Sequence, residues 1–354
     1  MTQSIADQSV KAVTAAKCIV WDLDDTLWHG TLADGDDVVL KDGMAELVRT
    51  LDARGILQSI ASKNNHDDAV RKLNEFGIAE YFLRPQINWN SKSSSIAAIR
   101  EQLNIGIDTI MFVDDQAFER DEVAFVHPQV ETVDAAEYRS LASAPRLTPA
   151  VVTDDARRRR LMYLEDEARA DSEVAYQGPR EDFLRSLDMV FSISRATEED
   201  LARLEELTRR TNQLNSTGVH YSYDDLERLL DDPGHDLWVC ELVDRYGSYG
   251  KIGMALVAKD DHRWTIKMLL MSCRTVSKGV GTVLLSALIQ RASKQGVRLF
   301  ADFRRTDRNR QMLLTYQLAN FQVVSSDGAN YLYENDLSVH QEYPDYIVVN
   351  IDAE

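Results

Sequence analysis

Short apolar runs alternate with amphipathic stretches through the first third of the chain. The apolar runs lie at residues 17–24, 55–62, 81–87, 109–115 and 123–133. Helical patterns lie between several of them, at residues 42–54, 67–77 and 92–104. In the first of these, Leu47, Val48 and Leu51 share one helical face. Strands that alternate with such helices predict a Rossmann-like α/β fold, in which a parallel sheet is covered on both faces.

The pattern changes after about residue 140. A polar loop, SAPRLTP, is followed by one long charged helical stretch at residues 153–176, which Thr153 or Asp154 would cap. Further strands are predicted at residues 189–196, 236–244, 251–260, 263–274 and 297–305. Short turns between them predict mostly antiparallel pairing, and long helical patterns lie at residues 197–214 and 279–296. This half is predicted to be an α+β domain.

These patterns divide the chain into four segments. We expect an N-terminal tail at residues 1–15, the α/β domain at 16–145, a helical linker at 146–186 and the α+β domain at 187–354. A chain of 354 residues is long enough for two separate cores. The first residues contain no long apolar stretch, so we expect neither a signal peptide nor a membrane anchor there.

Composition narrows the class of protein. Hydrophobic residues make up 44% of the chain and charged residues 28%, as in globular proteins. The formal net charge of −18 argues against nucleic acid as a partner, because phosphate backbones attract clustered Lys and Arg. The three cysteines, Cys18, Cys240 and Cys273, have neither the spacing of a metal site nor that of a disulfide framework. We therefore expect a cytoplasmic protein with free thiols and no membrane partner.

Polar residues follow the predicted parallel strands. They are Asp22, Asp24, Thr26, Ser62, Lys92, Asp114 and Asp115. Each lies at or just beyond a strand end, or opens the following helix, so the topology should gather them over one crevice. Crowded carboxylates are unfavourable unless a cation lies among them or one is protonated, and oxygen ligands suit Mg²⁺.

This set predicts a phosphoryl-transfer site. Asp22 could attack phosphorus, and Asp24 could move the proton of the leaving group. Thr26, Ser62 and Lys92 are expected to bind the phosphate oxygens. The alternative, that acidic pairs at strand ends only keep the loops solvated, would be favoured for one pair but not for this ordered set.

Four motifs resemble those of the haloacid-dehalogenase superfamily. They are DLDDT at residues 22–26, IASKNN at 60–65, NSKSS at 90–94 and MFVDDQAFERDEV at 111–123. The resemblance implies a phosphoaspartate mechanism with Asp22 as nucleophile and Asp24 as acid/base. It also implies that Mg²⁺ is held by Asp22, the backbone carbonyl of Asp24 and the fourth motif, with Asp115 favoured as direct ligand and Asp114 as its neighbour. No large cap insertion lies between the first two motifs, so we expect an open site.

The second half contains a glycine turn between a predicted strand and a predicted helix. Gly279 and Gly281 lie in this turn, and backbone amides there could hold a pyrophosphate or the phosphate of a pantetheine arm. The segment at residues 269–289 resembles the coenzyme-A loop of the Gcn5-related acetyltransferase fold, and residues 306–324 resemble its Asn- and Tyr-bearing helix and following strand. This sequence departs from that family at Val276, where Gln or Arg is usual, which argues against ordinary acetyl-CoA chemistry.

Cys273 ends the predicted strand before this turn. Arg274 and Lys278 are near it in sequence and would favour its thiolate, which could then take part in acyl exchange with a pantetheine thiol. The alternative is a small buried hydrophobic residue, as we expect for Cys18 and Cys240.

The combination of both halves resembles the FkbH-like family across nearly the whole chain. The shared features are the capless phosphatase-like domain, the charged connector, TNQLNSTG at residues 211–218, and SCR followed by KGVG. The resemblance implies a glyceryl transferase/phosphatase of polyketide biosynthesis. Such an enzyme dephosphorylates D-1,3-bisphosphoglycerate and loads the glyceryl group as a thioester onto the phosphopantetheine arm of an acyl carrier protein. Cys273 would carry the glyceryl thioester before transfer.

Several roles stay open at this point. Asn212, Gln213 and Asn215 could bind polar groups of the substrate or only end the preceding helix. His220 and His340 are candidate bases for thiol exchange. The basic segment at residues 302–310 is expected to contact the acidic carrier protein. Two other functions compete with the glyceryl transferase: a stand-alone Mg²⁺-dependent phosphatase of small molecules, and a non-catalytic module that binds carrier proteins.

Overall fold

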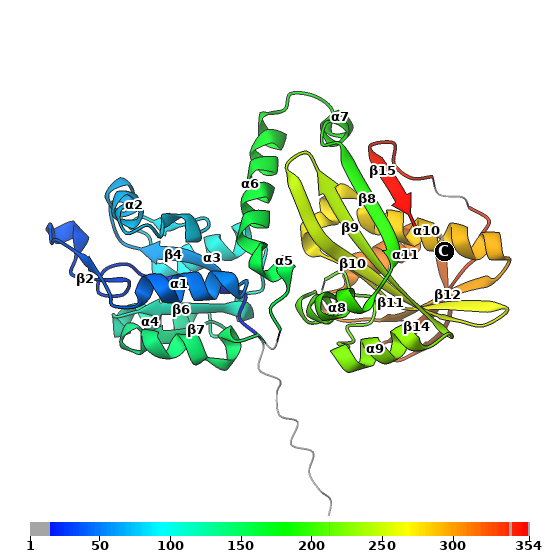
Figure 1. Cartoon of the computed structure of the whole chain (residues 1–354), viewed down its shortest axis with the longest axis horizontal. Coiled ribbons are helices and arrows are strands. Elements are labelled where there is room, and N and C mark those ends of the chain that lie inside the picture. Colours follow the sequence, from blue (N-terminus) through cyan, green and yellow to red (C-terminus); the bar gives the residue numbers. More distant parts are fainter. Residues whose placement is uncertain (1–14, 150, 212, 340–341, 353–354) are drawn as a thin grey trace, which may run out of the picture. The chain divides into compact units, whose positions relative to one another are not determined.

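The computed structural model describes residues 15–149, 151–211, 213–339 and 342–352 (Figure 1). The chain forms two compact units, Met1–Leu164 and Glu165–Glu354, which we call unit 1 and unit 2. Unit 1 contains a parallel sheet and unit 2 a mixed sheet, so the predicted fold class is confirmed. No helix among the residues that the structure describes has both the length and the apolar composition needed to cross a membrane.

The main sheet of unit 1 has five parallel strands in the order β5-β4-β1-β6-β7. They are β1 (Cys18–Trp21), β4 (Leu57–Ser62), β5 (Gln86–Ile87), β6 (Ile110–Asp114) and β7 (Glu131–Asp134). Trp21 at the end of β1 is paired with Ile60 of β4 and Val113 of β6. The strands therefore end almost level, and the residues that follow them meet at one edge of the sheet.

Helices cover both faces of this sheet. They are α1 (Met44–Ala53), α2 (His66–Glu75), α3 (Lys92–Gln102) and α4 (Ala117–Val126). Alternate residues of β1 belong to different cores: Ile19 and Trp21 lie with Leu47 of α1, whereas Cys18 and Val20 lie with Ile99 of α3. Both faces are apolar, which explains why the sequence of β1 shows a continuous apolar run instead of alternation.

The remaining elements of unit 1 are short. They are the two-stranded ribbon of β2 (Trp28–His29) and β3 (Val39–Leu40), and the 3₁₀ helices η1 (Leu32–Asp34), η2 (Ala79–Tyr81), η3 (Ile107–Thr109), η4 (Ala135–Ser143) and η5 (Pro145–Leu147). Between β1 and β4 the chain forms only β2, η1, β3 and α1, so no separate cap domain is inserted there.

Two apolar runs of unit 1 are not strands over their full length. The run at residues 81–87 contributes only the short β5, after η2 and a left-handed turn at Arg84. In the run at residues 123–133, Val123 is the buried residue of the last turns of α4, and the strand β7 begins only at Glu131. A short apolar run fits a helix end as well as a strand, and here contacts with the rest of the unit decide.

The charged stretch predicted as one helix is two helices, α5 (Asp154–Arg157) and α6 (Arg159–Ala175), followed by α7 (Arg180–Arg185). Thr153 caps α5, because its hydroxyl accepts a hydrogen bond from Ala156 N at 3.0 Å. The short helix α5 packs closely on Gly55, which has φ +72°, and a Cβ there would lie 2.6 Å from the carbonyl oxygen of Ala156 in α5. This close approach between backbones accompanies the break between the two helices.

Unit 2 contains one eight-stranded sheet in the order β13-β14-β12-β11-β10-β9-β8-β15. Its strands are β8 (Met189–Arg195), β9 (His235–Asp244), β10 (Gly247–Lys259), β11 (Arg263–Met271), β12 (Arg298–Arg304), β13 (Phe321–Asp327), β14 (Asn330–Asn335) and β15 (Ile347–Ile351). The pairs β11–β12 and β15–β8 are parallel and the other pairs are antiparallel.

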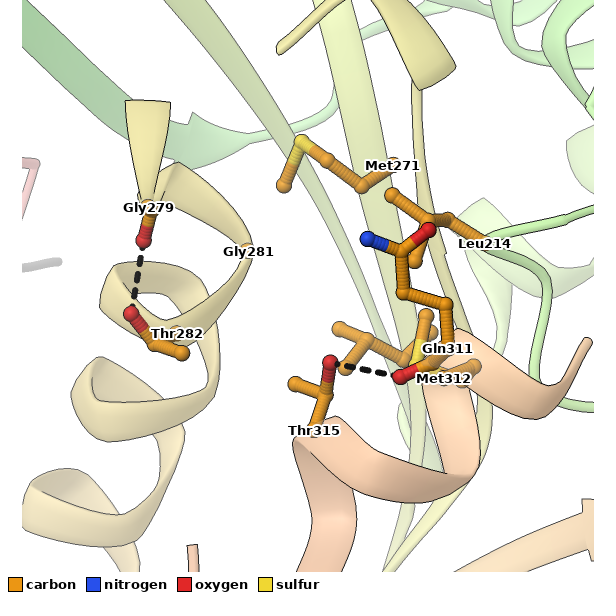
Figure 2. Close-up of a pocket in the computed structure, with 9 residues that line it drawn as sticks. Leu214, Met271, Gly279, Gly281, Thr282, Gln311, Met312 and Thr315 are labelled. Atoms are coloured by element: carbon orange, nitrogen blue, oxygen red, sulfur yellow. Dashed lines mark hydrogen bonds between the residues drawn. The ribbon is translucent and has the colours of Figure 1, made fainter. Parts of the chain in front are cut away.

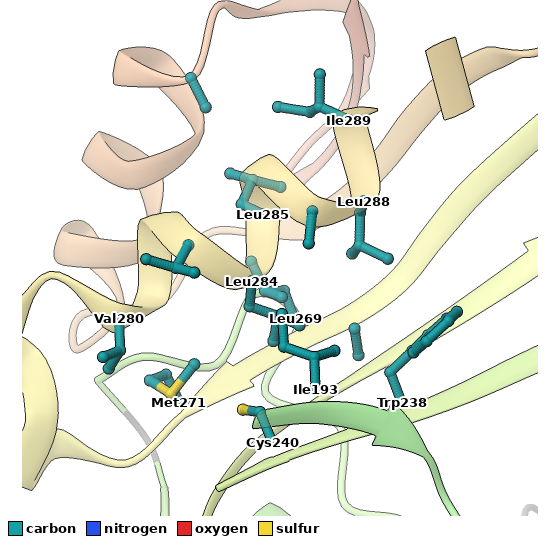
Figure 3. Close-up of a cluster of buried hydrophobic side chains, with 14 of the residues drawn as sticks. Ile193, Trp238, Cys240, Leu269, Met271, Val280, Leu284, Leu285, Leu288 and Ile289 are labelled. Carbon is teal, nitrogen blue, oxygen red and sulfur yellow. The ribbon is translucent and has the colours of Figure 1, made fainter. Parts of the chain in front are cut away.

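Helices also cover both faces of this sheet. They are α8 (Glu198–Arg210), α9 (Tyr223–Asp231), α10 (Val280–Gln295) and α11 (Arg310–Leu318), with the 3₁₀ helix η6 (Cys273–Lys278) before α10. Figure 3 shows Val280, Leu284 and Leu288 of α10 packed over the sheet. On the other face, Leu204 of α8 and Leu226 of α9 belong to a separate core.

Candidate active site

The carboxyl edge of the parallel sheet in unit 1 carries a cluster of acidic side chains. The backbone of Asp22 is fixed by a 2.9 Å hydrogen bond from its N–H to Val113 O, which links the ends of β1 and β6. Carboxylate oxygens of Asp22, Asp114 and Asp115 lie within 4.8 Å of one another. Asp22 and Asp114 are buried, whereas Asp115 is half-buried. Parallel topology thus brings together two motifs that are far apart in the sequence.

Lys92, at the start of α3, lies buried among these acids. Its Nζ donates to Asp22 Oδ1 and, at 2.9 Å, to the carbonyl oxygen of Ala61. It also pairs with Asp114 at 3.0 Å and with Glu119 at 2.9 Å. One ammonium group therefore compensates part of the charge of three carboxylates.

Burial and neighbouring charges both shift the pKa values of the groups in this cluster. Burial raises the pKa of Asp22, although Lys92 opposes the shift. Burial and then the charge of Asp22 raise the pKa of Asp114 to about 7. Burial alone would lower the pKa of Lys92, but the nearby carboxylates raise it, so its ammonium form is stable.

The other predicted phosphate-site residues lie beside the cluster. Ser62, buried at the end of β4, hydrogen-bonds the Asp22 carboxylate through its side chain. The Thr26 hydroxyl is buried and accepts a hydrogen bond from Asp115 N at 3.1 Å. Thr26 thereby joins the first motif to the fourth. The structure brings these two residues to the same edge as Asp22, Lys92 and Asp115.

Asp24 is held by three donors on its carboxylate. Its Oδ1 accepts from Trp28 Nε1 at 2.8 Å and from Leu32 N at 3.0 Å, and its Oδ2 accepts from Asn64 Nδ2 at 2.8 Å. The side-chain carboxylate of Asp24 is not part of the cluster formed by Asp22 and its neighbours, as far as the described residues show.

Two residues of this site were missed in the sequence analysis. Asn64 lies in the second motif and is buried, with its side chain on Asp24. Glu119 lies in the first turn of α4, where it pairs with Lys92 and, at 2.7 Å, with Lys63. The only local signal was that both residues lie inside the quoted motifs.

The donor set fits a hard divalent cation such as Mg²⁺. The three clustered carboxylates offer oxygen atoms, which Mg²⁺ prefers. One of these oxygens, Asp115 Oδ1, is buried and has no hydrogen-bond partner in the described part of the chain. A buried carboxylate oxygen without a partner is costly, and a cation would satisfy it.

The predicted site of unit 2 lies where β11 and β12 separate. These strands are paired only at Arg263–Ile266 and Arg298–Ala301 and then diverge. The segment Leu214–Thr217 fills the gap: Ser216 N donates to Leu269 O at 3.0 Å, and Arg304 N donates to Ser216 O at 2.9 Å. Residues 214–217 of this stretch, for which the sequence left both substrate binding and a helix end open, therefore form a strand-like insertion in this sheet.

A pocket of about 70 Å³ borders this insertion. Its lining residues are Leu214, Leu269, Met271, Gly279, Gly281, Thr282, Gln311, Met312 and Thr315. Figure 2 shows the pocket between the first turn of α10, which carries Gly281 and Thr282, and the start of α11. Gly279 has φ +78° and a conformation that favours glycine. The pocket has room for the narrow end of a ligand.

The other predicted residues of unit 2 that the structure describes are not among those that line this pocket. Cys273 is partly exposed at the start of η6 and is not one of the lining residues. Arg274 donates to Tyr249 O at 2.9 Å. Gln213 and His220 are exposed, and Asn215 is fully buried. Asn212 and His340 lie outside the described residues.

Comparisons with known proteins give partial matches. The chain matches no protein-family model and no curated protein. A solved structure of the N-terminal part of protein BF1531 from Bacteroides fragilis, which contains a phosphatase domain complexed with Mg, is 28% identical over 35% of this chain, with a TM-score of 0.33. The matched region spans only 38% of that phosphatase-domain chain.

Two further structures match about two fifths of the chain. The ribosomal-protein-S18-alanine N-acetyltransferase from Escherichia coli is 15% identical, with a TM-score of 0.34, over 43% of this chain and 97% of its own. The PaiA N-acetyltransferase from Thermoplasma acidophilum, in complex with coenzyme A, is 16% identical, with a TM-score of 0.33. The match covers 41% of this chain and 98% of the acetyltransferase chain.

Proposed function

We propose that the protein is a glyceryl transferase/phosphatase that acts on D-1,3-bisphosphoglycerate and loads the glyceryl group onto an acyl carrier protein of polyketide biosynthesis. The observation that carries the proposal is the cluster of Asp22, Asp114 and Asp115 around Lys92 at the carboxyl edge of a parallel sheet. The chain joins this cluster to a second unit with a small pocket beside a glycine turn. A substrate that contains both an acyl phosphate and a phosphoester requires both kinds of site.

In the phosphatase step, an oxygen of Asp22 attacks phosphorus while the bond from phosphorus to the leaving oxygen breaks. Asp24 donates a proton to that oxygen, then takes a proton from the water that hydrolyses the aspartyl phosphate. Lys92 and Ser62 hold the Asp22 carboxylate in place. Mg²⁺ held by Asp22, Asp115 or Asp114 and the Asp24 carbonyl would supply positive charge for the phosphoryl oxygens.

In the transfer step, the Cys273 thiolate attacks the carbonyl carbon of the acyl phosphate, and the bond from that carbon to the phosphate oxygen breaks. The carrier's pantetheine thiol then attacks the resulting thioester, and Cys273 leaves as a thiolate. Arg274 and Lys278 follow Cys273 on η6, and we assign them the role of supporting a nucleophilic thiolate there. The pocket beside Gly279 and Gly281 is the proposed site for the pantetheine arm, with Gln213 and Asn215 in the adjoining segment.

The carrier is the proposed macromolecular partner. Arg304, Arg305 and Arg310 are exposed around the end of β12 and the start of α11, and none of the three forms an ion pair with another described residue. Free guanidinium groups on a chain with a net charge of −18 favour an acidic partner at this place. These arginines lie at or just before the start of α11, and the first turns of α11 line the pocket beside Gly279.

The test is a loading assay with the full chain, Mg²⁺, D-1,3-bisphosphoglycerate and a carrier protein that carries its pantetheine arm. Intact-mass spectrometry should detect a glyceryl thioester on the carrier, and omission of the enzyme is the control. Phosphate release without an adduct on any carrier would leave the stand-alone phosphatase, and no phosphate release at all would leave the carrier-binding module.

A further inference from the structure

A groove in unit 2 has no role in the steps described so far. Its volume is about 530 Å³, within the range of roughly 300–1,000 Å³ that is usual for small-molecule sites. The groove lies between the segment after Ser216, the end of β12 and the β13–β14 hairpin. Its lining residues are Thr217, Val219, Asp302, Phe303, Arg304, Ser325, Ser326, Asp327, Asn330, Tyr331 and Leu332.

The wall that carries Thr217 is held rigidly. The Asn215 side-chain oxygen accepts hydrogen bonds from Thr217 N at 3.2 Å and from Gly218 N at 2.9 Å. Asn309 Nδ2 donates to Asn215 O at 3.2 Å and to Arg304 O at 2.8 Å, which ties the segment to the end of β12. Side chains on such a wall are already in place before any ligand arrives, which lowers the entropic cost of binding.

Two polar atoms of this wall are buried without a partner. Thr217 is 8% exposed, and its hydroxyl has no hydrogen-bond partner in the described structure. The Nδ2 of Asn215, a fully buried residue, also has none among the described groups. Buried polar atoms are almost always paired, and Thr217 is the one of these two residues that lines the groove. Its hydroxyl therefore indicates that a ligand or its water completes it.

The lining favours a neutral ligand with hydroxyl groups. Ser325, Ser326 and Asn330 offer both donors and acceptors. Asp302 pairs with Lys267, while Arg304 and Asp327 carry opposite charges, so the groove has no strong excess of either sign. Carboxylates, hydroxyls and amides beside the apolar side chains of Val219 and Leu332 suit a group whose polar face is a diol and whose other face is C–H.

We propose that this groove binds a small neutral hydroxylated acyl group, and that the Thr217 hydroxyl bonds one of its hydroxyls. That the acyl group is glyceryl rests on the proposed function. The ligand class itself follows from the groove.

The test uses D-glyceramide, a neutral amide with two hydroxyls, and propionamide, which has none. Saturation-transfer NMR on the full chain, without Mg²⁺, should detect D-glyceramide binding that is at least about fivefold tighter than propionamide binding, the factor expected for one hydrogen bond. Thr217→Val keeps the shape of the side chain and should remove that preference.

Thermal unfolding separates this role from a structural one. Because the Thr217 hydroxyl has no partner, Thr217→Val should leave the melting temperature unchanged or raise it, although ligand binding weakens. Thr315→Val is the matched control, since Thr315 lines the other pocket and bonds Gln311 O. It should leave the preference for D-glyceramide intact.

Equal binding of the two amides, or an unchanged preference in Thr217→Val, would overturn the proposal. Neither result depends on phosphate release or on carrier loading. D-glyceramide binding with a negative loading assay would contradict the proposed function alone, and the reverse pattern would contradict the groove alone.

Discussion

Two adjacent asparagines show how far the role of a residue depends on its partner. Asn64 and Asn65 follow the same strand, β4. Asn64 donates to the carboxylate of Asp24, whereas Asn65 accepts from Asp67 N and Asp68 N and caps α2. The first residue therefore positions a proposed catalytic group, and the second stabilises a helix.

Replacing each asparagine with alanine separates these roles. Asn64→Ala should lower kcat for phosphate release about tenfold to hundredfold, because Asp24 loses one of the three donors that fix its carboxylate. KM should change little, since Asn64 acts through Asp24. Phosphate release from a phosphoester, in the absence of carrier protein, measures both constants.

Asn65→Ala is the matched control. It should cost about 1 kcal/mol of stability through loss of the α2 cap and leave kcat near the wild-type value. If Asn64→Ala kept full kcat, the positioning role of Asn64 would be wrong.

Asp114 predicts how the stability of unit 1 depends on pH. Burial and the charge of Asp22 raise its pKa to about 7, above the value of about 4 for an unfolded chain. Between these values the metal-free folded state binds more protons than the unfolded state, so the free energy of unfolding falls as pH rises. In EDTA, the melting temperature should therefore be lower at about pH 8 than at about pH 5.5.

Added Mg²⁺ and a substitution of Asp114 both test whether the raised pKa of Asp114 causes this pH dependence. Mg²⁺ should raise the melting temperature more at about pH 8, where its carboxylate ligands are ionised, than at about pH 5.5. Asp114→Asn should flatten the pH dependence in EDTA. A melting temperature that rises with pH in EDTA in the wild-type chain would contradict the assignment.

At the scale of elements, the sequence predicted those parts of the fold that local pattern controls. Buried apolar runs that end in polar residues predicted the strands β1, β4 and β6. From the parallel topology of these strands we then expected Asp22, Ser62 and Asp114 to lie at one edge of the sheet. The positions of Asn64 and Glu119 in the site depend on partners across the sheet, which no local pattern contains. The insertion of residues 214–217 between β11 and β12 likewise depends on long-range backbone pairing.

The glycine turn before α10 contains a matched pair of residues. Gly279 has φ +78°, and a Cβ there would lie 3.1 Å from the Tyr346 hydroxyl. Gly281 has ordinary helical backbone and no atom within 4 Å of a built Cβ. Gly279→Ala should therefore destabilise the chain by about 1 kcal/mol or more, whereas Gly281→Ala should be neutral or slightly stabilising in thermal unfolding.

Carrier loading adds a second measurement on the same pair. If the pantetheine arm approaches the backbone here, Gly281→Ala should lower the rate of loading several-fold despite its normal stability. Unchanged loading by Gly281→Ala would place the arm elsewhere.

The exposed arginines near the start of α11 should make carrier loading sensitive to salt. Arg305→Glu should weaken carrier loading and reduce its sensitivity to salt, because one attractive contact with an acidic carrier becomes repulsive. The initial rate of loading at several salt concentrations measures both effects. Arg298→Glu, at the other end of β12, is the control and should load like the wild-type chain. Equal losses in both variants would mean a general charge effect instead of docking.

At the scale of the whole molecule, each unit has its own hydrophobic cores. The cores of unit 1 contain residues from Ala16 to Leu147, and those of unit 2 contain residues from Phe183 to Ile347. A substitution in one site should therefore leave the fold of the other unit intact. This independence allows the two proposed chemical steps to be removed one at a time.

The last prediction uses Cys273 and Asp22 to separate those steps. Cys273→Ala should abolish carrier loading while phosphate release continues, because the carboxylate cluster of unit 1 is unchanged. Asp22→Asn should abolish hydrolysis of the phosphoester, so any acyl group on the carrier keeps that phosphate. Loading should still release one phosphate per acyl group, because attack by Cys273 expels the acyl phosphate. Phosphate assays and intact-mass spectrometry of the carrier measure the two outcomes side by side.

Cys240→Ala is the control for loss of a thiol, because Cys240 is buried in β9, and burial raises its pKa so that the thiolate is disfavoured. This variant should still load the carrier. If Cys273→Ala also loaded the carrier at the wild-type rate, the pantetheine thiol would have to attack the acyl phosphate directly. The second unit would then bring the two substrates together without forming a thioester of its own.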